Sequence, residues 1–123
     1  MKIREYETKQ EMFLSVPNNG IGAEVGVCKG MNSINLWHLT RPSKMYLCDI
    51  WKERHPNMYL LEDPTLWEDN HEKLVTKIFS KEVEEGSVEL HREWGGNFLY
   101  SLPDNHLDWL YLDACHDYKP VSI

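Results

Sequence analysis

The chain has 123 residues, of which 41% are hydrophobic and five are tryptophan, so it can bury the core of one small domain. Its formal net charge of -7 argues against the basic surface that binds nucleic acid or anionic membranes, and we expect neither partner. No apolar run is long enough to cross a bilayer, and the charged start resembles neither a signal peptide nor a transit sequence. Three cysteines without metal-binding spacing fit a reducing compartment, so we expect a cytoplasmic protein.

In the first half of the chain, short apolar runs alternate with helical patterns. A short helix is expected within residues 4–15, before a Pro-Asn-Asn-Gly turn. Residues 21–27 form a small apolar run that is typical of a central strand covered on both faces. A helix is expected to follow over residues 30–39, closed by an Arg-Pro pair, and residues 44–50 form the second predicted strand. The expected packing face of this helix comprises Ile34, Trp37 and His38.

The second half continues the alternation. Residues 51–63 have no clear period and are expected to form a loop, whereas residues 64–84 have the charge and spacing of one helix or two. A short strand is predicted at 88–91, a brief helix at 95–102 and a strongly apolar strand at 107–112. This alternation predicts a single α/β domain over all 123 residues, with a mostly parallel sheet and flanking helices.

Two glycines and an acidic residue mark the ends of the first two predicted strands. Gly26 permits a sharp turn and close approach of a ligand, and Gly30 lets the next helix begin against that ligand. The same glycine spacing also occurs in tight turns that bind nothing. Asp49 ends the second strand, where an acidic side chain can accept hydrogen bonds from both ribose hydroxyls, although an isolated Asp there can also cap a helix. Together these residues predict a site for an adenosine-type ligand.

The charge around the glycine loop distinguishes two such ligands. Pyrophosphate is bound by the free amides of a Gly-x-Gly-x-x-Gly turn, and this sequence lacks that pattern. Glu24 precedes the loop and would repel pyrophosphate, whereas its field suits a cofactor that carries an ammonium and a sulfonium group. The comparison favours S-adenosylmethionine and leaves an NAD-binding oxidoreductase domain as the alternative.

The segments GAEVGVCKGMNS, YLCDIW, ELHREWG and LDWLYLDACHDYKPV resemble successive motifs of class I S-adenosylmethionine-dependent methyltransferases, especially a small bacterial and phage-type group. The resemblance runs from about residue 20 to the end of the chain. It implies a Rossmann-like sheet, incomplete relative to the seven-stranded methyltransferase fold, with the first and fourth strands adjacent. The cofactor-binding residues that it implies are Glu24, Gly26 and Gly30 along the methionine and ribose, Asp49 at the ribose hydroxyls, Trp51 and Trp94 along the adenine, and Glu93 at its exocyclic amine.

The fourth predicted strand runs into Asp113-Ala-Cys-His116-Asp-Tyr. Asp113 resembles the metal-binding aspartate of catechol and caffeoyl-CoA methyltransferases, and His116 falls at the position of their general base. The resemblance therefore implies O-methyl transfer to a small molecule or sugar, in which His116 accepts the proton of the substrate hydroxyl and Asp113 is a ligand of Mg²⁺. The alternative is that both side chains cap the following loop.

The outer edge of the strand at 107–112 has no expected neighbour, and its only internal charge is Asp108. Because bare strand edges are usually covered or paired, we expect a homo-oligomer, to be tested by light scattering across a dilution series. Three readings of the short chain stay open: a fragment of a longer product, a short protein that completes its site by oligomerising, and a cofactor-binding module without catalysis. A structural α/β partner subunit is a further alternative.

Overall fold

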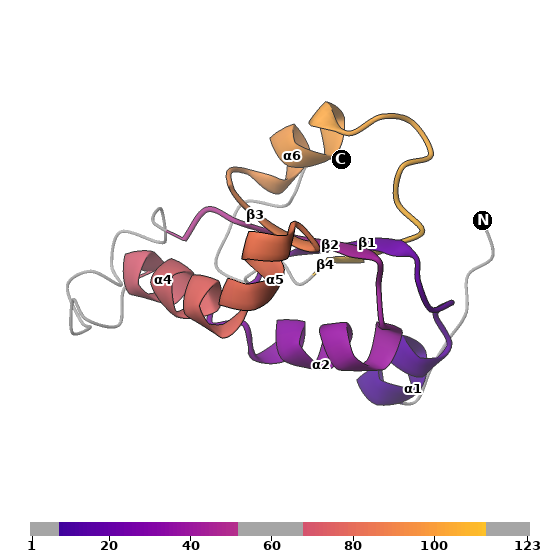
Figure 1. The fold of residues 1–123 in the computed structure, drawn as a ribbon. Helices are drawn as coiled ribbons and strands as arrows, with labels where there is room; N and C mark the ends of the chain where they lie inside the picture. The colour runs from indigo at the N-terminus through magenta and orange to yellow at the C-terminus, as the bar shows by residue number, and fades with distance from the viewer. Residues whose placement is uncertain (1–7, 52–67, 113–123) are drawn as a thin grey trace.

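The computed structural model describes residues 8–51 and 68–112. The elements in chain order are α1 (Lys9–Leu14), β1 (Ile21–Val25), α2 (Met31–Thr40), β2 (Lys44–Asp49), α4 (Glu68–Ile78), α5 (Ser80–Glu85), β3 (Val88–Arg92), α6 (Gly95–Ser101) and β4 (Trp109–Leu112). The strands form one parallel sheet in the order β3-β2-β1-β4 (Figure 1). The predicted α/β, Rossmann-like fold is confirmed, and so is the adjacency of the first and fourth strands.

Helices cover both faces of the sheet. In Figure 1, α6 lies above the sheet, and α1 and α2 lie below it. The larger core joins α1, α2, α4 and α5 to the lower face; its buried members are Phe13, Val27, Leu36, Met45, Leu47, Trp51, Val75, Phe79 and Val88. The smaller core lies under α6; its buried members are Ala23, Val25, Tyr46, Cys48 and Phe98. Burial on both faces explains why β1 and β2 read as nearly continuous apolar runs.

The first helix after β1 differs from its prediction in which side chains it buries. α2 begins at Met31 because Gly30, at φ 84°, is its N-cap, and the left-handed Arg41 is its C-cap. Its fully buried side chains are those of Ser33, Leu36 and Thr40, which recur at the three- to four-residue spacing of one helix face. His38 is exposed, so the predicted packing role of His38 is wrong, whereas Ile34 and Trp37 are partly buried against the core.

The second half of the sheet follows the predicted order with shifted boundaries. Within the predicted helical stretch 64–84, the described residues form two helices, α4 and α5, and the buried Phe79 lies between them. Gly86, at φ 87°, ends α5 in the left-handed conformation that glycine adopts readily. β3 continues to Arg92, one residue beyond its predicted end. The predicted loop 51–63 lies outside the described residues, apart from Trp51.

β4 begins at Trp109 rather than at the predicted residue 107. Asp108 precedes it and binds both backbone groups of Ile21: its N–H donates to Ile21 O at 2.7 Å, and its Oδ2 accepts from Ile21 N at 2.7 Å. Trp109 then pairs in register with Gly22 of β1, and its ring lies over that glycine. A Cβ atom at position 22 would lie 1.8 Å from Trp109 Cε2, so this placement of the ring requires glycine there.

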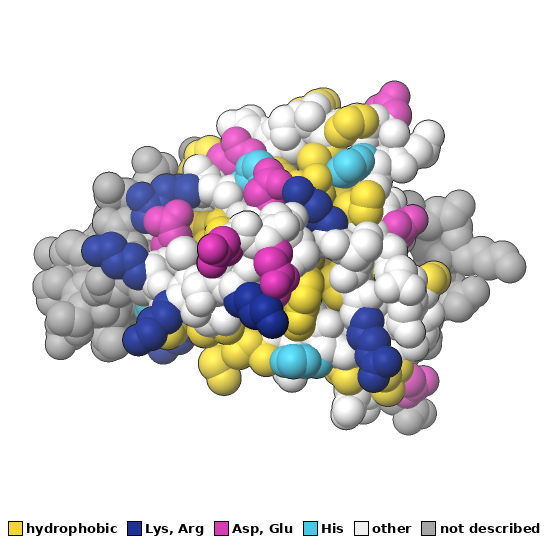
Figure 2. Space-filling view, viewed as in Figure 1, with side chains coloured by type: hydrophobic (Ala, Val, Ile, Leu, Met, Phe, Trp, Pro, Cys, Tyr) yellow, Lys and Arg dark blue, Asp and Glu magenta, His cyan; other side chains and the backbone are white. Residues whose placement is uncertain are grey.

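The described surface is mixed in character. Acidic and basic side chains are interspersed on the face shown in Figure 2. None of the helices in the described part of the chain is long and apolar enough to span a membrane. Among the described residues β4 is an edge strand, and its Leu110 and Leu112 are exposed; self-association along that edge stays a prediction.

Candidate functional site

The carboxyl ends of the parallel strands bring most of the predicted site residues to one edge of the sheet. Loop 26–30 leaves β1 at this edge, Asp49 ends β2, and Glu93 follows β3 directly. The backbone joins these ends, because Gly26 N donates to Cys48 O at 2.9 Å and Glu93 N donates to Asp49 O at 3.1 Å. β1 lies between β2 and β4, so the edge is the switch point at which open α/β sheets bind ligands.

Loop 26–30 is a tightly wound segment. Gly26, Cys28 and Gly30 all have left-handed φ values, of 95°, 55° and 84°. The amides of these three residues are satisfied within the chain. Their acceptors are Cys48 O at 2.9 Å, Asp49 Oδ2 at 2.7 Å and Val27 O at 3.1 Å. These N–H groups are therefore committed to the protein's own acceptors rather than to a phosphate, which such loops bind through free amides.

Asp49 is a nearly buried carboxylate, 8% exposed, and both of its oxygens accept backbone hydrogen bonds. Oδ2 accepts from Cys28 N at 2.7 Å, and Oδ1 accepts from Trp51 N at 3.0 Å. Trp51 lies within the larger core with no exposed surface, and its Nε1 donates to Cys28 O at 2.9 Å. The structure thus places Asp49 at the predicted edge and Trp51 inside the protein, beneath the loop.

Glu24 of β1 is fully buried on the side of α2. One carboxylate oxygen accepts from Asn32 Nδ2 at 3.0 Å and the other accepts from Ser33 Oγ. Both partners belong to the first turn of α2, whose positive dipole end also stabilises a negative charge. Neither Asn32 nor Ser33 was among the residues predicted from the sequence. The sequence contained one signal for them: two polar residues stand in the first turn of a helix that packs against the strand containing an acidic residue.

α4 supports the loop from the other side. His71 of α4 is almost fully buried, and its Nδ1 lies 3.9 Å from Cys28 Sγ. A Cβ atom on Gly30 would lie 3.0 Å from Val75 Cγ2, so Gly30 serves the helix contact as well as the left-handed turn. Sequence spacing contained no signal for these contacts, because they depend on how α4 packs. They give Cys28, for which the sequence indicates no role, a defined place at the site.

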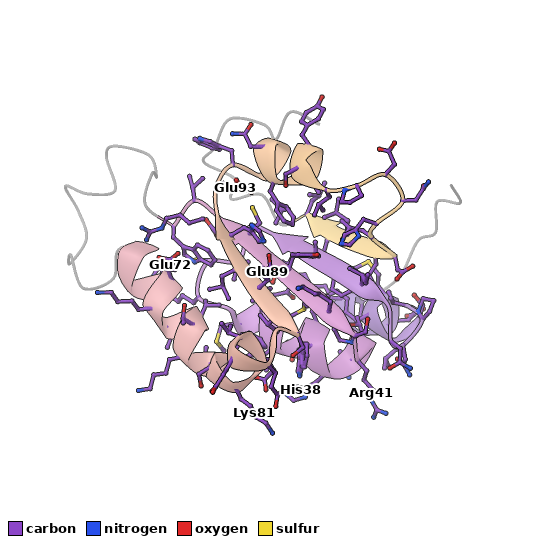
Figure 3. The ribbon with its side chains drawn as sticks, turned by 45° about the horizontal axis from the view of Figure 1, so that its top comes forward. His38, Arg41, Glu72, Lys81, Glu89 and Glu93 are labelled. Carbon is purple, nitrogen blue, oxygen red and sulfur yellow. The ribbon has the colours of Figure 1, made fainter. Side chains whose placement is uncertain are left out.

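The end of β3 contributes Glu93 and Trp94. Glu93 O accepts from Cys48 Sγ at 3.3 Å, and the Glu93 carboxylate lies 3.7 Å from His91 Nδ1. In Figure 3, Glu93 lies where β3 leads toward α6, farther along the chain than Glu89. Trp94 is the N-cap of α6 and its side chain is 45% exposed, so its ring is accessible at the same edge. Burial, followed by the charges of Glu93 and Asp49, raises the pKa of the Cys48 thiol to about 12.

The predicted catalytic pair lies outside the described residues. The pair consists of His116 and Asp113, and Asp113 is also the predicted metal ligand. Within residues 8–51 and 68–112, no group of three or more His, Cys, Asp or Glu side chains could hold a metal ion. The assignments of Asp113 and His116 therefore stay predictions.

The model of a protein family described as a methyltransferase domain matches residues 23–123. No curated protein matches the sequence significantly. Among solved structures, a precorrin-6y C5,15-methyltransferase from Geobacter metallireducens GS-15 is similar, with a TM-score of 0.52 and 16% identity. The match covers 84% of this chain and 44% of that one, so this chain spans less than half of that protein, and the likeness shows the fold. By its family match and its fold, the chain belongs to the class I S-adenosylmethionine-dependent methyltransferases.

Proposed function

We propose that the chain binds S-adenosylmethionine at the carboxyl ends of β1 and β2 and forms the cofactor-binding part of a methyltransferase. The proposal rests on one observation about loop 26–30: the amides of Gly26, Cys28 and Gly30 already donate to acceptors within the chain. Two carboxylates, Asp49 and Glu24, also lie beside the loop. This arrangement disfavours the pyrophosphate of NAD and suits a cofactor with cationic ammonium and sulfonium groups.

The residues present at the edge fit such a cofactor. Gly26 lets the ligand approach the backbone of the loop, and Gly30, with Val75 against it, makes the left-handed turn from which α2 begins beside the ligand. Each Asp49 oxygen accepts one amide and retains a lone pair for a ribose hydroxyl. The partly exposed Glu93 can accept from the exocyclic amine of adenine, next to the accessible ring of Trp94. In this proposal Glu24 acts from inside the protein. Its negative charge contributes to the electrostatic field at the site, and its carboxylate accepts hydrogen bonds that fix the first turn of α2.

The cofactor supplies an electrophilic methyl group on its sulfonium. We propose that an oxygen of a small molecule or sugar accepts the methyl group and that His116 takes the proton of that hydroxyl. Asp113 lies three residues earlier and would offer a carboxylate to Mg²⁺, a cation that prefers oxygen ligands. The resemblance of the Asp113 to Tyr118 string to methyltransferase motifs supports this finer assignment.

A ligand screen tests the proposed cofactor. S-adenosylmethionine and S-adenosylhomocysteine, each at a hundredfold excess over its dissociation constant, are expected to stabilise the folded protein by about 2.7 kcal/mol. Thermal unfolding with S-adenosylmethionine, S-adenosylhomocysteine, NAD and ATP measures the effect. Stabilisation by NAD alone would favour the oxidoreductase alternative, and stabilisation by none of the four would favour a structural subunit.

Replacement of His116 by alanine tests the proposed base. We expect methyl transfer to fall by roughly 10²- to 10⁴-fold, because a positioned general base contributes about that much. In the unmodified enzyme the rate should rise with pH through the titration of the histidine, since only neutral imidazole accepts a proton. The exposed His38 on α2 is the matched control, and His38→Ala should retain both the rate and the profile. A flat profile, or full activity of His116→Ala, would assign His116 to loop capping.

A further inference from the structure

We infer that Trp51 is a positioning residue that, together with Asp49, fastens Cys28 and so holds loop 26–30 in the shape that receives the cofactor. We call the three hydrogen bonds among these residues the loop latch. They run from Cys28 N to Asp49 Oδ2 at 2.7 Å, from Trp51 N to Asp49 Oδ1 at 3.0 Å and from Trp51 Nε1 to Cys28 O at 2.9 Å. The latch ties the loop after β1 to the end of β2. The identity of the ligand rests on the proposed function, whereas the latch itself does not.

Backbone conformation shows why the loop needs a latch. Cys28 and Trp51 have φ values of 55° and 49°, in the left-handed region that residues with a Cβ atom rarely adopt. Such conformations persist only where the surroundings hold them, and they cluster at ligand sites. Here the two strained residues lie at the two ends of the latch, and each has a backbone group bound by it. The latch therefore opposes relaxation of both residues toward ordinary φ values.

The position of Trp51 makes its indole an effective anchor. The ring has no exposed surface and packs in the larger core, so its N–H cannot turn toward solvent as a surface donor would. On the other side of the loop, His71 contacts Cys28 Sγ, and Val75 lies against Gly30. The loop is thus held between a core indole and α4. Cys28 itself is partly accessible, so the reactivity of its thiol reports how firmly the loop is held.

Two tryptophan variants distinguish the effect of losing the latch hydrogen bond from the effect of losing side-chain packing. Trp51→Phe keeps an aromatic ring in the core and removes the N–H that binds Cys28 O. Trp109→Phe is the matched control, because Trp109 Nε1 is buried without a hydrogen-bond partner among the described residues. Both variants lose the same indole atoms, and only Trp51→Phe opens the latch.

The first readout is alkylation of Cys28 by iodoacetamide without cofactor, followed by peptide mass spectrometry. The sulfur attacks the carbon that bears iodine, iodide leaves, and the thiol proton passes to buffer. We expect Cys28 to react about tenfold faster in Trp51→Phe, which corresponds to the loss of about 1.4 kcal/mol of restraint, and at an unchanged rate in Trp109→Phe. Cys48, which is buried with a pKa of about 12, reports global unfolding. Unchanged Cys28 reactivity, or a parallel rise at Cys48, would overturn the inference.

The second readout is the affinity for S-adenosylhomocysteine by calorimetry. We expect Trp51→Phe to bind about tenfold more weakly than the unmodified protein and Trp109→Phe to bind with the same affinity. Faster alkylation of Cys28 with unchanged affinity would show that the latch does not position the cofactor and would overturn the inference. If S-adenosylhomocysteine binds none of the proteins while the alkylation rates differ as expected, the latch is supported and the proposed ligand is wrong.

Discussion

Replacement of Asp49 by alanine is expected to weaken S-adenosylhomocysteine binding by roughly 2 to 4 kcal/mol, because the two charge-assisted hydrogen bonds proposed between Asp49 and the ribose would be lost. The structure adds a second reason. The backbone amides of Cys28 and Trp51 lose their acceptors, so two of the three hydrogen bonds of the loop latch are lost. Isothermal titration calorimetry measures the affinity, and chemical denaturation measures the accompanying loss of stability.

Asp108→Ala is the matched control for this prediction. Asp108 also accepts a backbone hydrogen bond through its carboxylate, from Ile21 N at 2.7 Å, but at the amino end of β1, opposite the proposed site. We expect Asp108→Ala to lower stability and to leave the affinity unchanged. Asp49→Asn, which keeps one side-chain oxygen, should bind with intermediate affinity. An Asp49→Ala variant that binds as tightly as the unmodified protein would remove Asp49 from the cofactor site.

Replacement of Gly22 by alanine is expected to destabilise the fold by roughly 3 kcal/mol or more, at or above the upper end of overpacking effects. The new Cβ atom would lie 1.8, 2.0 and 2.4 Å from three ring atoms of Trp109, which is far inside van der Waals contact. Gly22 and Trp109 are register partners, so relief of the overlap requires the ring to leave its observed rotamer or the two strands to shift. Urea denaturation of the two proteins measures the difference in unfolding free energy.

A double-mutant cycle checks the cause of this loss. In a Trp109→Ala background, Gly22→Ala should be nearly neutral, because the ring that it would overlap is gone. Gly86→Ala is a second control: a Cβ atom there meets nothing within 4 Å, and only its φ of 87° opposes alanine, so a loss of about 1 kcal/mol is expected. An equal loss for Gly22→Ala in both backgrounds would contradict the overlap between the two side chains.

The sequence alone was sufficient for the fold class and for the positions of the strands. β1 and β2 are buried on both faces, so they stand out as apolar runs, and the helices between them require a parallel sheet. The turn at Gly26 and the helix start at Gly30 were also predictable, since few other residues adopt their φ values without strain. The end of β1 at Val25 and the start of β4 at Trp109 were not predictable. They are decided by the backbone turn at Gly26 and by the hydrogen bonds of Asp108.

For the site, the sequence by itself determined which acidic residue and which glycines end β1 and β2, because strand ends in a parallel sheet meet at one edge. Only the tertiary structure decided what those side chains touch. Glu24 is held by the first turn of α2, and Trp51 lies in the core rather than on the surface. Periodicity reports which face of an element is buried, whereas hydrogen-bond partners such as Asp49 and Cys28 depend on how separate elements are placed together. That placement is a property of the packed fold, and no local pattern in the chain contains it.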